Sequence, residues 1–171
     1  MKVILSMAVS ANGIIATKTG SEDFLYSGNW VRFIELARKV GCIIWGRKTY
    51  QQVISWEGDY LKDIQDIKKV IISRSSIQLK EGFILASFPE EALEILRKEG
   101  FKEVIVTGGS KTNMEFAKRG LIDEVILDVN SIIIGEGISV FAQGSFDMKL
   151  ELIESVRVNE NILELRYMVV K

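Results

Sequence analysis

Short, continuous apolar runs separated by amphipathic stretches constrain the fold of this chain more than any other feature of its sequence. Four such runs, rich in Val and Ile, lie at Lys2–Val9, Gly41–Trp45, Lys69–Ser73 and Glu103–Thr107. A run without polar alternation is typical of a strand buried on both faces, as in a parallel sheet. Glycine or polar residues follow each run and are expected to end the strand.

Helices are predicted between these strands. In Asn29–Val40 the apolar residues recur at helical spacing, and charged residues occupy the opposite face. Pro89–Glu99 carries a similar apolar stripe and stops before Gly100, a residue type that favours the end of a helix. A third, shorter helix is predicted over Thr112–Arg119.

The last third of the chain changes character. A strand is predicted at Asp123–Val129, and two longer strands at Lys149–Val158 and Ile162–Val170 are separated by three polar residues suited to a hairpin. This order of elements predicts an α/β fold in three layers, with a mostly parallel central sheet and an antiparallel C-terminal hairpin. No linker or repeat divides the sequence, so residues 1–171 are expected to form one domain.

Composition excludes several classes of function. The chain has 171 residues, no histidine and one cysteine, which rules out a Ser-His-Asp triad, a histidine-ligated metal and an all-cysteine metal cluster. Its 22 basic and 23 acidic residues give a net charge of -1, without a basic stripe for nucleic acid. No segment reaches the roughly 18 apolar residues of a membrane span. A cytoplasmic protein without metal, nucleic-acid or membrane partners is expected.

Ligands of open α/β sheets bind beyond the carboxyl ends of the strands, so the loops there are the candidate sites. The segment Gly46-Arg47-Lys48-Thr49 places cations and a hydroxyl at a possible helix start, which can hold a phosphate. Gly108-Gly109-Ser110-Lys111 lets the backbone approach a ligand before another helix. Ser73-Arg74 suits a phosphomonoester such as the 2′-phosphate of NADP.

Each loop alone also has an ordinary explanation, as a tight turn, a solvated helix start or a polar loop. Three phosphate-competent loops after three parallel strands together favour a dinucleotide that lies across the edge of the sheet. The usual Rossmann fingerprint is absent, because Gly135-Glu136-Gly137 is the one G-x-G and Val140 replaces the third glycine. A nicotinamide site in this chain must therefore belong to another fold.

The order of short motifs along the chain resembles that of the dihydrofolate reductase superfamily, and is most similar to the reductase domain of riboflavin biosynthesis. That family has S-x-D-G-x-I-A after the first strand, then G-R-x-T-Y, V-x-G-G, G-L-I-D-E and a G-x-G before a Phe. The matching segments here are Ser10–Ala16, Gly46–Tyr50, Val106–Gly109, Gly120–Glu124 and Gly135–Gly137 with Phe141. The resemblance covers essentially the whole chain.

The resemblance implies an NADPH-dependent reductase of a pyrimidine or pterin. By the matching motifs, the residues against the cofactor would be Ala8, Ile15, Gly46, Arg47, Thr49, Ser73, Arg74, Gly108, Gly109, Ser110 and Lys111. Asn12 would be the catalytic residue and would contact the substrate together with Trp30 and Glu136. Core packing of Trp30 and a solvated turn at Glu136 remain the alternatives.

The leading substrate is 5-amino-6-(5-phosphoribosylamino)uracil or a similar pyrimidine, and the alternative is dihydrofolate or another pterin. Asn12 stands where the family has Asp, and an amide cannot act as a carboxylate base. This departure motivates a second alternative, a catalytically silent NADPH-binding module. The nearest acidic residues are Glu22 and Asp23, which as loop charges are more often solvated. A homodimer is expected, because the long apolar C-terminal strands would leave an adhesive edge in a monomer.

Overall fold

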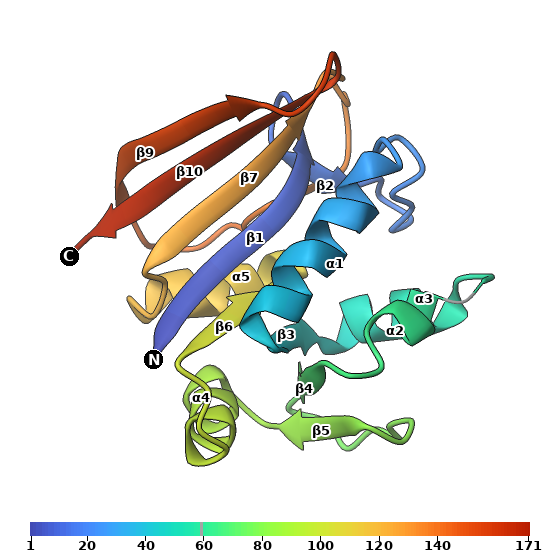
Figure 1. Ribbon diagram of the computed structural model, residues 1–171, viewed down its shortest axis with the longest axis vertical. Helices are drawn as coiled ribbons and strands as arrows, with labels where there is room; N and C mark the ends of the chain where they lie inside the picture. The colour runs from blue at the N-terminus through green and yellow to red at the C-terminus, as the bar shows by residue number, and fades with distance from the viewer. Residues whose placement is uncertain (59) are drawn as a thin grey trace.

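The computed structural model describes residues 1–58 and 60–171, which form an eight-stranded sheet and the smaller pair β2–β8 (Figure 1). The order in the large sheet is β5-β4-β3-β6-β1-β7-β10-β9. The first six strands in this order run parallel to one another, β10 is antiparallel to β7, and β9 is antiparallel to β10. This confirms the predicted α/β fold with an antiparallel C-terminal hairpin. The strands are β1 Lys2–Ser10, β2 Ile14–Ala16, β3 Cys42–Gly46, β4 Lys68–Ile72, β5 Phe83–Ala86, β6 Glu103–Val106, β7 Glu124–Asn130, β8 Ile138–Ser139, β9 Lys149–Arg157 and β10 Ile162–Val170.

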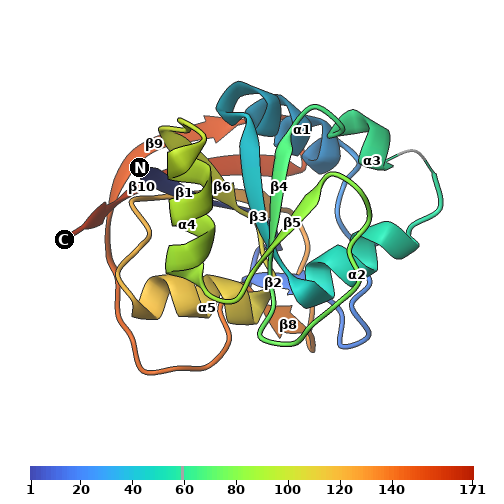
Figure 2. The ribbon, with the colours of Figure 1, turned by 90° about the horizontal axis from the view of Figure 1, so that it is seen from below.

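Helices cover both faces of the sheet because neighbouring strand residues point to opposite sides. Cys42 and Ile44 of β3 pack on the side of α4 and α5, whereas Ile43 and Trp45 pack on the side of α1 and α2. Figure 2 shows α1 and α5 on opposite sides of the central strands. The helices are α1 Gly28–Val40, α2 Arg47–Ser55, α3 Tyr60–Asp63, α4 Pro89–Lys98 and α5 Ser110–Lys118. The result is three layers with a core on each face.

The structure differs from the sequence prediction at several short elements. The predicted third helix begins two residues earlier, so Ser110 and Lys111 belong to the first turn of α5 rather than to a loop. The strands β2, β5 and β8 were not expected, since two to four residues carry too little periodicity to identify a strand. In the described part of the chain, no helix combines the length and the apolarity needed to cross a membrane.

The hairpin β9–β10 forms one edge of the sheet and exposes apolar side chains to water. Every residue of β9 is exposed, and β9 pairs with β10 alone. The exposed apolar side chains of the two strands are Leu150, Leu152, Ile153, Val156, Leu163, Met168 and Val170. By the strand register, Leu150, Leu152 and Leu163 project from the same side of the sheet, and we call these three residues the hairpin face. Exposed apolar surface of this kind on an edge strand favours association with another chain.

Candidate functional site

Two helix N-termini meet at the carboxyl ends of the adjacent strands β3 and β6. Gly46 precedes α2 and Gly109 precedes α5, and neither position supplies a side-chain cap to its helix. The Gly46 amide donates a hydrogen bond of 2.8 Å to the carbonyl of Gly108, which holds the two ends together. Uncapped amides in the first turn of a helix bind anions, and here two such turns lie side by side.

Glycine is needed at three positions here, because of close packing at Gly46 and Gly109 and because of the backbone conformation at Gly108. A Cβ atom at Gly46 would lie 2.2 Å from Oγ1 of Thr112, and one at Gly109 would lie 3.2 Å from Oγ1 of Thr49. Gly108 has a φ of +90°, and its peptide bond to Gly109 is cis. We call this set, Gly46, Thr49, Gly108, Gly109 and Thr112, the glycine cradle. The uncapped first turns of α2 and α5 beside it, together with the Thr49 hydroxyl, are suited to a pyrophosphate.

Two arginines lie near the glycine cradle at the same edge of the sheet, Arg47 directly after β3 and Arg74 two residues after β4. Gly46 of β3 lies beside Ile72 of β4 in the strand register, so the residues that follow, Arg47 and Ser73, also leave neighbouring strands. The Ser73 hydroxyl donates to the Ser75 carbonyl at 2.8 Å and thereby shapes the loop. Arg74 is exposed and has no ion pair among the described residues. These cations are suited to a phosphate at the far end of a dinucleotide.

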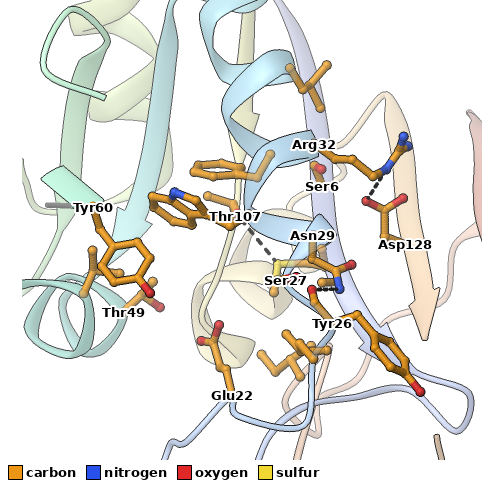
Figure 3. A pocket seen from close by; sticks show the side chains of 18 of the residues that line it. Ser6, Glu22, Tyr26, Ser27, Asn29, Arg32, Thr49, Tyr60, Thr107 and Asp128 are labelled. Carbon is orange, nitrogen blue, oxygen red and sulfur yellow. Dashed lines mark hydrogen bonds and ion pairs between the residues drawn. The ribbon is translucent and has the colours of Figure 1, made fainter. Parts of the chain in front are cut away.

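A cleft of about 800 Å³ opens beside the cradle, on the face of the sheet that carries α1 and α2 (Figure 3). It is continuous with the cradle at Thr49 and lies next to it at Thr107. Four of the residues that the sequence predicts for the site line this cleft, namely Ala8, Ile15, Trp30 and Thr49. The fold therefore places the sheet edge that carries the glycine cradle beside an open cleft large enough for a small molecule.

Aromatic rings from three elements form one wall of the cleft. Trp30 of α1 lies 5.9 Å from Trp56, which follows α2, and 5.1 Å from Tyr60 of α3, measured between ring centroids. The Trp30 indole donates a hydrogen bond of 2.9 Å to the carboxylate of Asp63. We call these three rings the aromatic wall. Trp56 and Tyr60 were not among the predicted site residues, because contacts between separate helices are not visible in the spacing of the sequence.

Glu22 is the carboxylate with the most altered environment in the cleft. Figure 3 shows its side chain pointing into the open volume, from the loop that precedes α1. No hydrogen-bond donor or cation in the described part of the chain pairs with it. Burial, reinforced by the nearby charge of Asp23, raises the pKa of Glu22 to about 7. A carboxyl group that titrates near neutrality in a cleft is a frequent feature of functional sites.

Across α1 from the aromatic wall, the charges of the cleft are paired. Arg32 donates to Asp128 at 3.0 Å and also forms an ion pair with Glu164 (Figure 3 shows the first of these). Arg166 approaches Glu164 at 3.5 Å and Glu124 at 3.7 Å. The positive charge of Arg32, a possible anchor for an anionic substrate, is therefore neutralised by carboxylates of β7 and β10.

Asn12 and Glu136 lie in loops outside the residues that line the cleft. The Asn12 amide donates to the Ile134 carbonyl at 2.8 Å and accepts from the Ile134 amide at 3.1 Å. It thus joins the loop after β1 to the loop after β7. Glu136 forms an ion pair of 2.5 Å with Lys18 at the surface. The remaining predicted residues, Ser110 and Lys111, lie in the first turn of α5.

The sequence profile of the RibD C-terminal domain matches residues 1–163. The uncharacterized protein YyaP of Bacillus subtilis (strain 168) is 24% identical over 177 residues, which cover 97% of this chain and 94% of YyaP. A putative riboflavin biosynthesis protein from Shewanella sp. PV-4 superposes with a TM-score of 0.82 at 23% identity and full coverage of both chains.

A deaminase and 5-amino-6-(5-phosphoribosylamino)uracil reductase from Thermotoga maritima superposes with a TM-score of 0.73 at 17% identity. The match covers 99% of this chain and 56% of that larger protein. At these identities, the two structural matches establish a shared fold.

Proposed function

Because the chain belongs to the RibD C-terminal domain family, we propose that it is an NADPH-dependent reductase of a small nitrogen heterocycle and that its 171 residues act as one reductase domain. The observation that carries this proposal is the glycine cradle, in which two uncapped helix N-termini meet at the mouth of the cleft. Phosphates of a dinucleotide in the cradle would leave its other end inside the cleft, beside Ala8 and Ile15.

Each part of the cofactor has a matching group of residues in this proposal. The glycine cradle, with Ser110 and Lys111 of α5, would hold the pyrophosphate, and Arg47, Ser73 and Arg74 would contact the adenosine 2′-phosphate. When bound, the nicotinamide supplies a hydride. The chain itself binds and orients the two reactants and excludes water from the space between them, which is where most of the catalytic effect of such a site arises.

For the substrate, the pathway relatives support 5-amino-6-(5-phosphoribosylamino)uracil or a similar pyrimidine, and the aromatic wall supports any planar ring, including a pterin. Trp30 would pack against this ring. Asn12, held by the backbone of Ile134, would act by fixing the loop that borders the nicotinamide, and Glu136 would lie at the outer rim of the site.

The test of this function is hydride transfer by the purified chain. NADPH absorbance is followed after addition of a reducible pyrimidine ribotide or a dihydropterin. The proposal expects oxidation of NADPH that depends on one of these acceptors. If NADPH binds but no acceptor of either class is reduced, the chain is the silent binding module instead.

Removal of the Arg74 guanidinium is expected to weaken NADPH binding about tenfold or more and to leave NADH binding unchanged. The physical reason is the loss of a charge-assisted contact that only the 2′-phosphate can make. Calorimetric titration of Arg74→Ala with both nucleotides measures the difference. Arg97→Ala, an exposed arginine in the last turn of α4, serves as the control for a general loss of positive charge. Equal losses of NADPH and NADH affinity in Arg74→Ala would contradict this assignment.

A homodimer is expected to form through the hairpin face. Light scattering should give twice the mass of the 19.3 kDa chain. Leu152→Glu, which places a charge in this face, should give the monomer mass because a desolvated unpaired charge is costly. Ile133→Glu is the matched control, since Ile133 is 75% exposed but lies outside the hairpin. A monomeric parent chain, or equal effects of the two variants, would count against dimerisation at this face.

A further inference from the structure

We propose that a buried pair of amide side chains, Asn29 of α1 and Asn130 of β7, positions two walls of the cleft relative to each other for hydride transfer. This inference rests on the proposed reductase function and adds two positioning residues to it. The sequence does not connect the two residues, because they lie 101 positions apart. They act through the backbone segments that they join.

The two amide groups exchange hydrogen bonds. Nδ2 of Asn29 donates to Oδ1 of Asn130 at 2.7 Å, and Nδ2 of Asn130 donates back to Oδ1 of Asn29 at 3.3 Å. Asn29 is 7% exposed and Asn130 is 0% exposed. Figure 3 shows Asn29 between Tyr26 and Arg32, on the side of α1 that faces the sheet. Loss of either amide would leave the other buried without its partner, which is costly, so the pair is a firm link.

On the sheet side, Asn130 is tied to two strands at the floor of the cleft. It is the last residue of β7 and lies beside Ser10 of β1 in the strand register. Its Nδ2 group shares its hydrogens with two further acceptors, the carbonyls of Val9 at 3.1 Å and Asp128 at 2.9 Å. Val9 directly follows Ala8, the residue proposed to lie beside the nicotinamide. Asn130 is thereby fixed to the wall that the cofactor would contact.

On the helix side, the same pair holds the start of α1. Ser27, which precedes the helix, provides no side-chain cap. Nδ2 of Asn29 donates to the Tyr26 carbonyl at 2.7 Å, and the Tyr26 amide donates to Oδ1 of Asn130 at 3.3 Å. The turn at Tyr26 and the first turn of α1 are therefore both attached to β7. Trp30 of the aromatic wall is the next residue along this turn.

The apolar contacts of α1 do not fix its distance from the sheet by themselves. Ile34 and Ala37 pack against the strands, but apolar burial has no preferred direction. Arg32 also joins α1 to β7, through a long side chain that is 27% exposed and therefore partly screened by water. Hydrogen bonds are directional, and those between Asn29 and Asn130 are buried. This pair is therefore suited to set the spacing between helix and sheet.

That spacing matters because the pair stands between the two reactants. Ala8 lies one residue before Val9, Trp30 lies one residue after Asn29, and Ala8 and Trp30 both line the cleft. Reacting atoms must come within about 3–3.5 Å of each other, and a misplacement of about 1 Å costs about a hundredfold in rate. A change in the spacing would therefore slow hydride transfer while leaving the glycine cradle intact.

The test is a single turnover of the NADPH-loaded chain after mixing with 5-amino-6-(5-phosphoribosylamino)uracil or with dihydrofolate. A C=N or C=O carbon of the acceptor gains the hydride, its heteroatom gains a proton from solvent, and NADPH is released as NADP⁺. We expect Asn29→Ala and Asn130→Ala each to lower the rate constant by about tenfold to a hundredfold, with an unchanged dissociation constant for NADPH. The double variant should be no slower than the slower single variant, because both residues act through one link.

A purely structural role would have a different signature. Partial unfolding lowers the amplitude of the single turnover, because fewer chains react, and leaves the rate constant of the folded chains unchanged. Ile122→Ala is the control for lost stability, since Ile122 is fully buried in the core on the α4 and α5 side of the sheet. This variant should lower the amplitude at most. A rate constant that fell equally in Ile122→Ala would overturn the positioning role.

The outcomes separate this inference from the proposed function. If the parent does not bind NADPH, the reductase proposal fails and this inference fails with it. If the parent oxidises NADPH and Asn29→Ala does so at the same rate, the positioning role is wrong and the reductase proposal stands.

If the parent binds NADPH but reduces neither acceptor, the reductase proposal fails and hydrogen exchange decides whether the pair couples the two walls. NADPH should then slow amide exchange at Tyr26 and Asn29 in the parent and have less effect in Asn130→Ala, whereas equal slowing in both would overturn the link.

Discussion

Gly46→Ala is expected to abolish detectable NADPH binding and to destabilise the chain by about 1–3 kcal/mol, as is typical of overpacking. The new methyl group would lie 2.2 Å from Oγ1 of Thr112 and 3.6 Å from the carbonyl oxygen of Gly108. Because Thr112 is buried in the first turn of α5, this helix would have to move away from α2. The two N-termini that form the glycine cradle would then separate. Thermal unfolding with and without NADPH measures both effects.

The cause of that effect can be isolated with two further variants. Gly46 has an ordinary extended backbone, with φ of -78° and ψ of 158°, so alanine is strained there by its surroundings and not by its own conformation. The double variant Gly46→Ala/Thr112→Ala removes the clashing hydroxyl and should recover part of the lost stability. Gly135→Ala, with no atom within 4 Å of its new methyl group, should behave like the parent. If NADPH raised the thermal midpoint of Gly46→Ala as much as that of the parent, the assignment of the glycine cradle as the pyrophosphate site would be wrong.

Glu22→Gln is expected to stabilise the folded chain at pH 8 by up to about 3 kcal/mol, and to have little effect near pH 4.5. The pKa of Glu22 rises from 4.5 to about 7 on folding, mainly because the carboxylate is buried. Between these pH values the folded state binds more protons than the unfolded state, so the free energy of unfolding falls as the pH rises. The penalty is complete above pH 7, and glutamine, which cannot ionise, escapes it.

Thermal midpoints of Glu22→Gln and the parent, measured from pH 4.5 to pH 8, test this prediction. The gap between them should open through pH 7 and amount to several degrees, since about 1 kcal/mol shifts the midpoint of a chain this long by about 2–4 °C. Glu57→Gln, which removes an exposed carboxylate of the same cleft, should give no such gap. A constant difference across the pH range would mean that Glu22 is not buried as a carboxyl group.

The sequence predicts the strand ends and glycines at the edge of the site better than the side chains inside the cleft. The four apolar runs and the residues after them are sufficient to place Gly46 and Gly108 at one edge of the sheet, because the ends of parallel strands meet there. At Gly108 the glycine reflects its own positive φ, whereas at Gly46 it reflects the close contact with Thr112. The start of α5 was predicted two residues late, since Ser110 and Lys111 lack the apolar periodicity that marks a helix.

The interior of the cleft depends on contacts between residues far apart in the chain, which cannot be inferred from the spacing of residues in the sequence. Glu22 follows a polar segment and has the pattern of a solvated charge, and only the packing of its loop beside α1 buries it. Asn12 pairs with Ile134, 122 residues away, so its bridging contact could not be read from the chain. Arg32 is similar, since its carboxylate partners lie 96 and 132 residues further on.

The most direct test of the account is the thermal midpoint of the chain with NADPH and with NADH at matched concentrations. A ligand that binds only the folded state stabilises it by about 2.7 kcal/mol at a hundredfold excess over its dissociation constant. The account predicts a rise of several degrees with NADPH and a much smaller rise with NADH. No rise with either nucleotide would contradict the cofactor site at the glycine cradle and would leave the fold without its proposed chemistry.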